Sequence, residues 1–293
     1  MSRPTLSIVI VSWNTRELLD ACLVSIRTIP DEVTREVIVV DNASADGSAE
    51  MVARDHPQVT LIANDENRGY AAGNNQGTEV AEGEHVLLLN PDIVVLDGAL
   101  DTLARFLQEH PRAGAVAPRL ILPDGSVQAS CRSFPTPDVV LYEALGLSRL
   151  FPRSRRFGRY RMTWWDYDDE RPVDQPMASA ILVRGAALNE VGEMDEQFPI
   201  FFNDVDLCKR LRDAGWEIWF TPRAGMIHVG GASTGQVRRR MLTESHRSFL
   251  RFYRKHYHGE FAWWKYYGAV ALLKLGHGVR VAAHAVRGLR GAS

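Results

Sequence analysis

A single acidic residue follows a proline at the end of an apolar run, in the stretch HVLLLNPD at residues 85–92. The run predicts a buried strand that Asn90, Pro91 and Asp92 end. A carboxylate at such a strand end can bind a divalent cation, which neutralises the phosphates of a bound nucleotide. The simpler alternative is a turn in which Asp92 accepts a hydrogen bond from a nearby backbone N–H.

A second acidic cluster lies at the start of a predicted helix, in FFNDVDLCKRLRDAG at residues 201–215. We expect Asn203 to cap this helix, with Asp206 at its third position. Asp204 then lies in the first turn, where the helix dipole favours the ionised carboxylate. Dipole stabilisation alone would account for Asp204, and the functional alternative is a general base that faces a cleft.

The stretch MIHVGGAS at 226–233 contains the one histidine that we single out, His228, at the end of a predicted strand. Gly230 and Gly231 follow it closely and would let the backbone approach a ligand. A lone histidine is more often a structural hydrogen-bonding residue than a metal ligand or a phosphate contact. Both interpretations stay open for His228.

Alternating strands and helices must position these residues. Near-continuous apolar runs predict strands covered on both faces, and Asn14 with Glu17 predicts the start of the first helix. This alternation predicts a mostly parallel α/β sheet, in which ligands bind beyond the carboxyl ends of the strands. Asp41 and Asn42 lie at one such end, although an Asx turn or helix cap would also explain Asp41. The strands are expected at 6–12, 36–42, 59–64, 85–90, 177–185, 216–222 and 226–233, the helices near 70–82, 97–110 and from 203, and a hairpin at Asp124-Gly125.

The turn after the first strand excludes two common nucleotide-binding motifs. A dinucleotide-binding domain would place GxGxxG there, but the sequence has SWNTRE, and it contains no P-loop. A sugar-nucleotide pyrophosphorylase would also need a glycine-rich, basic loop at this position. A metal ion held by Asp92 is therefore the simplest means of neutralising phosphates.

Composition indicates an ordinary globular protein of 293 residues, 45% hydrophobic and 24% charged. Its three cysteines are far apart, so neither a disulfide framework nor a zinc site is expected. The apolar start is too short for a signal peptide, and no segment has the length of a membrane span. We therefore expect a cytoplasmic protein.

The C-terminal 58 residues are strongly basic. Residues 236–293 carry twelve Lys/Arg against two Glu, although the whole chain has a net charge of −2. Apolar and basic residues alternate over 272–289 with helical spacing, after Trp263, Trp264 and two tyrosines. This pattern predicts an anchor on an anionic membrane surface, at the inner face of the cytoplasmic membrane. The alternatives are a helix packed on the preceding part of the chain or a homodimer contact.

Six arginines lie among aromatic residues in RLFPRSRRFGRYRMTWW, residues 149–165. Arginine suits a pyrophosphate group or lipid headgroups, and we assign Arg153 and Arg156 to binding a ligand that carries such a group. Nucleic acid is not an expected partner, because residues 1–235 are acidic and contain no nucleic-acid motif.

Several stretches, taken in order, resemble the inverting family 2 glycosyltransferases and most closely their rhamnosyltransferase-like branch. They are SIVIVSWNTRELLDACLVSI, EVIVVDNASADGS, NRGYAAGNNQG, VLLLNPDIVV and FFNDVDLCKRLRDAGWEI with HVGGAS, over residues 5–235. The resemblance implies a nucleotide-sugar-binding GT-A domain at 1–235, followed by a basic helical extension at 236–293. It implies that Asp41 hydrogen-bonds a pyrimidine base. The nucleotide site that it implies comprises Val11, Ser12, Trp13, Asn14, Asp41, Asn42, Asn67, Gly69, Gly73, Asn74 and Asn90.

The same resemblance implies the chemistry. Asp92 would bind Mg²⁺ or Mn²⁺ bridged to the diphosphate, His228 would lie near the metal, and Asp204 would deprotonate the acceptor hydroxyl. Asn90 replaces the first acid of the family's DxD motif. Asn203, where relatives usually carry Glu, is assigned to acceptor or sugar binding. Metal affinity and acceptor choice are the properties that these two departures affect.

The expected activity is transfer of rhamnose from dTDP-rhamnose to a hydroxyl of a glycan or polyprenyl-diphosphate-linked acceptor, in cell-surface polysaccharide synthesis. Two alternatives stay open: a hexosyltransferase that uses a UDP-sugar, and a non-catalytic relative that binds nucleotide or glycan.

Overall fold

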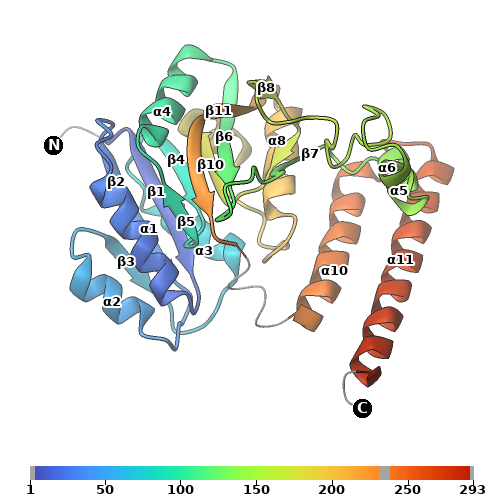
Figure 1. The fold of residues 1–293 in the computed structure, drawn as a ribbon, viewed down its shortest axis with the longest axis horizontal. Helices are drawn as coiled ribbons and strands as arrows, with labels where there is room; N and C mark the ends of the chain where they lie inside the picture. Colours follow the sequence, from blue (N-terminus) through green and yellow to red (C-terminus); the bar gives the residue numbers. More distant parts are fainter. Residues whose placement is uncertain (1–3, 231–237, 291–293) are drawn as a thin grey trace. The chain divides into compact units, whose positions relative to one another are not determined.

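The computed structural model describes residues 4–230 and 238–290 of the chain (Figure 1). These residues form two compact units. The first unit comprises residues 1–132 and 166–238, and the second comprises 133–165 and 239–293. The sequence-based domain boundary at residue 235 stays a prediction, and residues 231–235 of the glycine-rich segment lie outside the described residues.

The first unit contains a nine-stranded mixed sheet in the order β3-β2-β1-β4-β10-β6-β11-β5, with β8 paired to β11. Strands β1 to β4 run parallel to one another, whereas β10 is antiparallel to both of its neighbours, β4 and β6. Strands β7 (Cys131–Arg132) and β9 (Gln175–Pro176) form a separate two-stranded sheet. The strands of the large sheet are β1 (Leu6–Ser12), β2 (Arg35–Asp41), β3 (Thr60–Ala63), β4 (His85–Leu89), β5 (Ile93–Val95), β6 (Ala113–Ile121), β8 (Arg171–Pro172), β10 (Ala180–Arg184) and β11 (Glu217–His228).

Helices cover both faces of this sheet, as the continuous apolar runs predict. On one face, Leu6, Ile8 and Ile10 of β1 belong to a core that also includes buried residues of α1, α2 and α4. The intervening Val9 and Val11 face α3 on the opposite side, because side chains alternate along a strand. The helices of this unit are α1 (Arg16–Thr28), α2 (Ser48–Asp55), α3 (Tyr70–Glu79), α4 (Ala99–Glu109), α7 (Gly185–Val191) and α8 (Asn203–Asp213).

Two glycines allow α3 to lie close to β1. A Cβ atom at Gly77 would lie 2.4 Å from Val9 Cγ1, and one at Gly73 would lie 2.8 Å from Val11 Cγ1. Both separations are too short for real carbon atoms, so larger residues at these positions would push the helix away from the sheet. Gly73 therefore has a packing role at a position that the resemblance assigned to the nucleotide site.

The second unit is helical and packs around aromatic rings. Its helices are α5 (Pro137–Ala144), α6 (Leu147–Leu150), α10 (Arg238–Tyr257) and α11 (Trp263–Arg290), and α5 contacts α11. Tyr253 is fully buried, donates its hydroxyl hydrogen to the Pro135 carbonyl at 2.6 Å and packs edge-on against Tyr257. None of the helices within 4–230 and 238–290 combines the length and apolar character that crossing a membrane requires.

Three local predictions differ from the structure. Thr15, and not Asn14, precedes the first residue of α1, and Phe202 instead of Asn203 precedes α8. The strands expected at 216–222 and 226–233 are one strand, β11, with an irregularity between Thr221 and Gly225. The predicted hairpin is confirmed, since Gly125 N–H bonds the Leu122 carbonyl.

Candidate active site

The carboxyl ends of β1, β2 and β4 bring the predicted nucleotide residues to one edge of the sheet. Ser12 pairs with Asp41 in the parallel register, and Ile10 pairs with Leu89, the residue before Asn90. In a parallel sheet this is the edge at which ligands bind. Ser12 and Val11 are buried, whereas Trp13 and Asn14 are partly exposed.

Asp41 is fixed by its own turn and still keeps one oxygen without a partner. Its Oδ2 accepts the Ser44 N–H at 2.9 Å, so the Asx-type turn forms. Its Oδ1 is buried and accepts no hydrogen bond from the described part of the chain. A buried acceptor without a partner is uncommon in native proteins and indicates a missing ligand or water.

Asn14 connects the ends of β1 and β2. Its N–H donates to Ser44 Oγ at 2.9 Å, and its Oδ1 accepts the Ala45 N–H at 2.8 Å. The residue has a φ of 51°, and Ala43 has a φ of 59°, both in the left-handed region that non-glycine residues seldom adopt. Such strained backbone concentrates at functional sites.

The loop before α3 is bonded to the end of β2 and is also held by a bond within the loop. Asn42 Nδ2 donates to the Gly69 carbonyl at 3.0 Å, and Asn67 Oδ1 accepts the Gly69 N–H. Asn74 is 1% exposed; its Nδ2 donates to the Tyr70 carbonyl, while its Oδ1 has no partner within the described residues. This second orphaned oxygen lies in a predicted nucleotide-binding residue.

Asp92 and His228 come together although they are 136 positions apart in sequence. His228 Nε2 lies 3.4 Å from Asp92 Oδ1, and both residues are buried. Strand β5 brings them together, since His228 pairs with Ile93. Asp92 Oδ1 accepts no hydrogen bond from the residues that the structure describes. The turn alternative, in which Asp92 accepts a nearby backbone N–H, is therefore not supported at this oxygen.

Gln128 orients His228 and was not identified from the sequence. Its Oε1 lies 2.7 Å from His228 Nδ1. An amide oxygen can only accept, so this contact fits a ring that carries its hydrogen on Nδ1, the tautomer in which Nε2 can bind a metal ion. A lone glutamine in a turn has no sequence signal for this role.

The Asp92 and His228 pair fits a divalent cation that is shared with a diphosphate. Within the described residues, no group of three or more His, Cys, Asp or Glu side chains could hold a metal ion. Mg²⁺ is commonly bound by one or two protein ligands together with substrate phosphates and waters, and Mn²⁺ accepts similar oxygen ligands. One carboxylate with an orphaned oxygen and one oriented imidazole meet that requirement.

Asp204 lies in the first turn of α8, where its sequence predicts it, and is partly buried. Its Oδ1 accepts the Val205 N–H at 2.8 Å, and its Oδ2 accepts the Ala178 N–H at 3.3 Å. Burial raises the pKa of the Asp204 carboxyl above its usual range, and these N–H bonds oppose that rise. A raised carboxyl pKa suits a group that takes a proton.

The backbone of Ala178 and Ser179 links Asp204 to the end of β4. Ala178 N–H bonds Asp204, and the Ser179 carbonyl accepts the Asn90 N–H at 2.8 Å. Asp204 therefore contacts this short segment before β10 directly, and Asp92 lies two residues after Asn90, which the same segment contacts. Sequence reasoning missed this link, because the contacts are made by backbone atoms.

The remaining predicted residues are Asn203, whose Oδ1 accepts the Asp204 N–H at 2.7 Å, and two arginines of the second unit. Asn203 is 2% exposed, and its Nδ2 donates to the Phe198 and Ile200 carbonyls. Arg153 and Arg156 are exposed in the second unit, where Arg156 Nε donates to the Tyr142 hydroxyl at 3.1 Å. The roles predicted for these three residues stay predictions.

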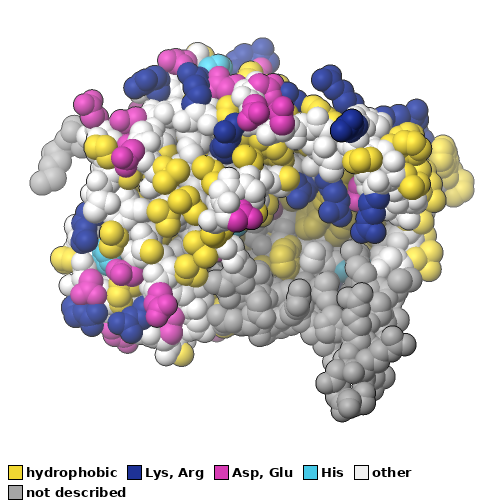
Figure 2. All heavy atoms as spheres, viewed as in Figure 1, with side chains coloured by type: hydrophobic (Ala, Val, Ile, Leu, Met, Phe, Trp, Pro, Cys, Tyr) yellow, Lys and Arg dark blue, Asp and Glu magenta, His cyan; other side chains and the backbone are white. Residues whose placement is uncertain are grey.

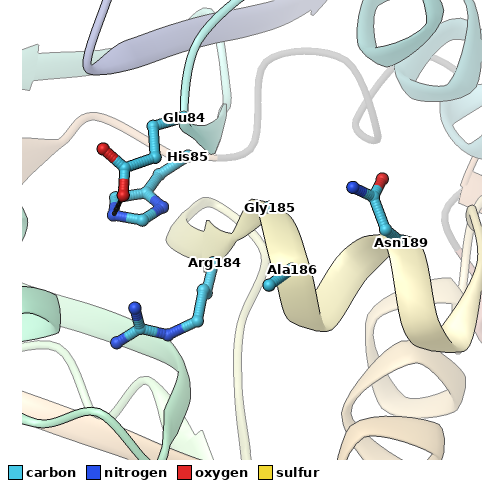
Figure 3. Close-up of a pocket in the computed structure, with 6 residues that line it drawn as sticks. All are labelled: Glu84, His85, Arg184, Gly185, Ala186 and Asn189. Carbon is cyan, nitrogen blue, oxygen red and sulfur yellow. Dashed lines mark ion pairs between the residues drawn. The ribbon is translucent and has the colours of Figure 1, made fainter.

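A cavity lies at the opposite edge of the sheet, at the amino end of β4 (Figure 3). Arg184 pairs with His85 there, and Glu84 Oε1 lies 3.7 Å from His85 Nε2. None of the predicted site residues lines this cavity. It is therefore separate from the edge that carries Asp41 and Asp92.

Known proteins share this architecture. A mannosyltransferase from Pyrobaculum calidifontis, solved with GDP-Man and Mn²⁺, matches 99% of this chain and 81% of its own with a TM-score of 0.60 at 20% identity. GalNAc-T7, solved with UDP, GalNAc and Mn²⁺, matches 78% of this chain and 44% of its own with a TM-score of 0.58 at 12% identity. The fold is thus the GT-A fold of glycosyltransferases, as the sequence predicts.

Sequence comparison defines the family. The profile of glycosyl transferase family 2 matches residues 7–166. The N-acetylglucosaminyl-diphospho-decaprenol L-rhamnosyltransferase of Mycobacterium tuberculosis is 31% identical over 271 residues, which cover 89% of this chain and 86% of the relative. A low-salt glycan biosynthesis hexosyltransferase of Haloferax volcanii is 24% identical over 71% of this chain and 61% of its own. The chain belongs to glycosyl transferase family 2 and is a glycosyltransferase.

Proposed function

We propose that this glycosyltransferase transfers rhamnose from dTDP-rhamnose, with inversion, to a hydroxyl of a lipid-linked saccharide in cell-surface polysaccharide synthesis. The observation that carries the proposal is the bond of Ala178 N–H to Asp204, one residue from the Ser179 bond to Asn90. It holds a carboxylate of raised pKa next to the strand end of Asp92. The 31% identity to the mycobacterial rhamnosyltransferase supports the choice of sugar and acceptor class.

The nucleotide is proposed to bind at the ends of β1 and β2. The orphaned Oδ1 of Asp41 can accept the N3–H of a thymine or uracil base. Asn74 Oδ1, the second orphaned oxygen, can accept a hydroxyl hydrogen of the donor. The other predicted residues, from Val11 to Asn14 and from Asn67 to Gly73, border the same site in this proposal.

We propose that Asp92 and His228 hold Mn²⁺ or Mg²⁺ together with the diphosphate. The 3.4 Å approach of His228 Nε2 to Asp92 Oδ1 supports a shared cation, as does Mn²⁺ in two proteins of the same fold. When bound, the cation stabilises the negative charge that develops on the departing nucleoside diphosphate. Asn90 contributes no carboxylate, so the diphosphate must supply more of the coordination.

Asp204 is proposed as the general base. It must accept the proton of the acceptor hydroxyl as the oxygen attacks the anomeric carbon, while the nucleoside diphosphate leaves from the opposite face. A single in-line displacement of this kind inverts the configuration. Burial raises the pKa of Asp204, which makes its carboxylate a stronger base for the hydroxyl proton.

The second unit is proposed to contact the membrane that carries the lipid-linked acceptor. Large apolar side chains are exposed on it: Trp263 is 74% exposed, Leu150 68% and Leu275 67%. Figure 2 shows hydrophobic side chains together with Lys and Arg over α5 and α6. Exposed aromatics mixed with arginines suit an anionic interface, where Arg153 and Arg156 would bind acceptor phosphate. The alternative is that a second copy of the chain covers this apolar surface in a dimer.

A transfer assay tests the proposed function. The purified chain is incubated with a synthetic N-acetylglucosaminyl-diphosphate lipid and with dTDP-rhamnose, UDP-sugars or GDP-mannose, each with Mn²⁺, Mg²⁺ or chelator. We expect a rhamnosylated product from dTDP-rhamnose that depends on the cation. Transfer from a UDP-sugar but not from dTDP-rhamnose would show that the enzyme is a hexosyltransferase that uses a UDP-sugar. Nucleotide binding without turnover would favour a non-catalytic relative.

A further inference from the structure

Tyr70, the first residue of α3, connects the start of that helix to the segment that contacts Asp204. Its backbone N–H donates to the Pro199 carbonyl at 2.7 Å, which fixes the start of the helix beside the loop that leads into α8. Its hydroxyl donates to the Ala178 carbonyl at 2.8 Å. The side chain therefore spans from α3 to the segment before β10.

The residue that Tyr70 contacts, Ala178, also contacts Asp204. Ala178 accepts the tyrosine hydroxyl at its carbonyl and donates its N–H to Asp204 Oδ2 at 3.3 Å. The next carbonyl, that of Ser179, holds Asn90. Tyr70 thus restrains Ala178, and Ala178 in turn restrains the Asp204 carboxylate.

We propose that Tyr70 is a positioning residue for Asp204. Its hydroxyl fixes the Ala178 backbone so that the Ala178 N–H directs Oδ2 and leaves the carboxylate oriented for the acceptor hydroxyl. This inference rests on the proposed role of Asp204 as the base. Tyr70 itself neither binds the donor nor accepts a proton in this proposal.

The electrostatic surroundings keep Tyr70 a hydrogen-bond donor. Burial raises the pKa of Tyr70, and the negative charges of Asp204 and Asp92 raise it further, so the hydroxyl stays protonated at every assay pH. Cys208, the other titratable group that faces Asp204, has a pKa raised well above its usual range by burial first and by Asp204 second. Among these three groups, the Asp204 carboxyl is therefore the one whose ionisation the acidic limb of the pH–rate profile would report.

Tyr70→Phe removes the hydroxyl and keeps the ring. We expect kcat to fall about 10- to 100-fold, a loss typical of a misplaced catalytic group, while KM for the donor changes less than about twofold. The acidic limb of the pH–rate profile should move to higher pH, because the Ala178 N–H bond that opposes the raised pKa of Asp204 is weakened. Hydrogen exchange in the peptide that contains Ala178 should become faster.

Tyr253→Phe is the matched control, since it also removes a buried tyrosine bond to a backbone carbonyl, in the second unit. It should leave the pH–rate profile and the exchange at Ala178 unchanged. A Tyr70→Phe enzyme with wild-type kcat and pH profile overturns the inference. So does unchanged exchange at Ala178 in a variant that binds donor normally. Failure of the wild-type enzyme to turn over any donor would instead overturn the proposed function.

Discussion

At the scale of single residues, three buried oxygens of the candidate site, on Asp41, Asn74 and Asp92, accept no hydrogen bond from the described residues. A buried polar group left unsatisfied costs about 1–3 kcal/mol of folding free energy. Three such groups at one sheet edge therefore lower the stability of the fold when no ligand is bound. A bound nucleotide and cation would satisfy them, so we expect ligand binding to stabilise the fold.

Removing the imidazole tests the proposed metal site. We predict that His228→Ala weakens Mn²⁺ binding in the presence of dTDP by more than about 100-fold, and that Gln128→Leu weakens it by about 10- to 100-fold. Gln128→Leu keeps the ligand but removes the oxygen that orients it. Mn²⁺ electron paramagnetic resonance titrations measure both affinities without any need for turnover.

His110→Ala serves as the control, because His110 stacks on Phe106 away from these ligands. It should leave Mn²⁺ affinity unchanged. Equal affinity in wild type and His228→Ala would show that the histidine is structural, the alternative that its sequence favours when taken alone.

The sequence identified the acids of the candidate site but not the residues that orient them. Asp41, Asp92 and Asp204 could be singled out because each follows a strand or starts a helix. Gln128 and Tyr70 carry no comparable signal. Their functions come from a 2.7 Å and a 2.8 Å contact with residues that are 100 and 108 positions away, and such pairings follow only from the complete fold.

At the scale of elements, the parallel part of the sheet follows from the sequence and the mixed part does not. Alternating apolar runs and helices are sufficient to predict β1 to β4. Strand β10 has the same apolar composition but runs antiparallel between β4 and β6, and composition does not encode strand direction. This reversal brings Ala178 and Ser179, just before β10, to the carboxyl end of β4, where they contact Asp204 and Asn90.

At the scale of the whole molecule, acidic and basic residues are divided along the chain. Twelve Lys/Arg against two Glu lie within 236–293, although the chain as a whole carries a net charge of −2. The structure describes the α11 backbone to Arg290, while the predicted apolar positions Val279, Ala282, Val286 and Leu289 have side chains outside the described residues. Exposed Trp263 and Trp264 at the start of α11 therefore carry the membrane proposal.

Flotation with vesicles tests this proposal. We predict that the full chain floats with phosphatidylglycerol vesicles and much less with phosphatidylcholine vesicles, because the basic residues require anionic lipid. Replacing both Trp263 and Trp264 by Ser should lower the partition coefficient about tenfold or more, since each indole can bury up to about 200 Å² of surface. Added salt should weaken binding of the wild type.

Val80→Ser, which removes an exposed apolar side chain from the first unit, should float like wild type. Equal flotation of the tryptophan variant would contradict the membrane proposal. A concentration-dependent dimer that the tryptophan substitutions dissociate would assign the same surface to a second copy of the chain.

The substitution Asp204→Asn tests the central claim most directly. Asp204 has a raised pKa in the folded protein. Its protonated form therefore contributes stability that is fully present below about pH 4, the ordinary pKa of an aspartate. That stability is lost as the pH rises through the raised pKa. A neutral Asn avoids this loss, and the variant should unfold at an equal or higher temperature at pH 7. Asp213→Asn, at the exposed end of the same helix, is the matched control and should retain full activity.

The decisive measurement combines sugar transfer and calorimetric binding of dTDP with Mn²⁺ on Asp204→Asn. We predict that turnover falls by about 10²- to 10⁴-fold, the usual contribution of a general base, while dTDP affinity stays within about twofold of wild type. Turnover within tenfold of wild type, in a variant that binds dTDP normally, would contradict the assignment of Asp204 as the base.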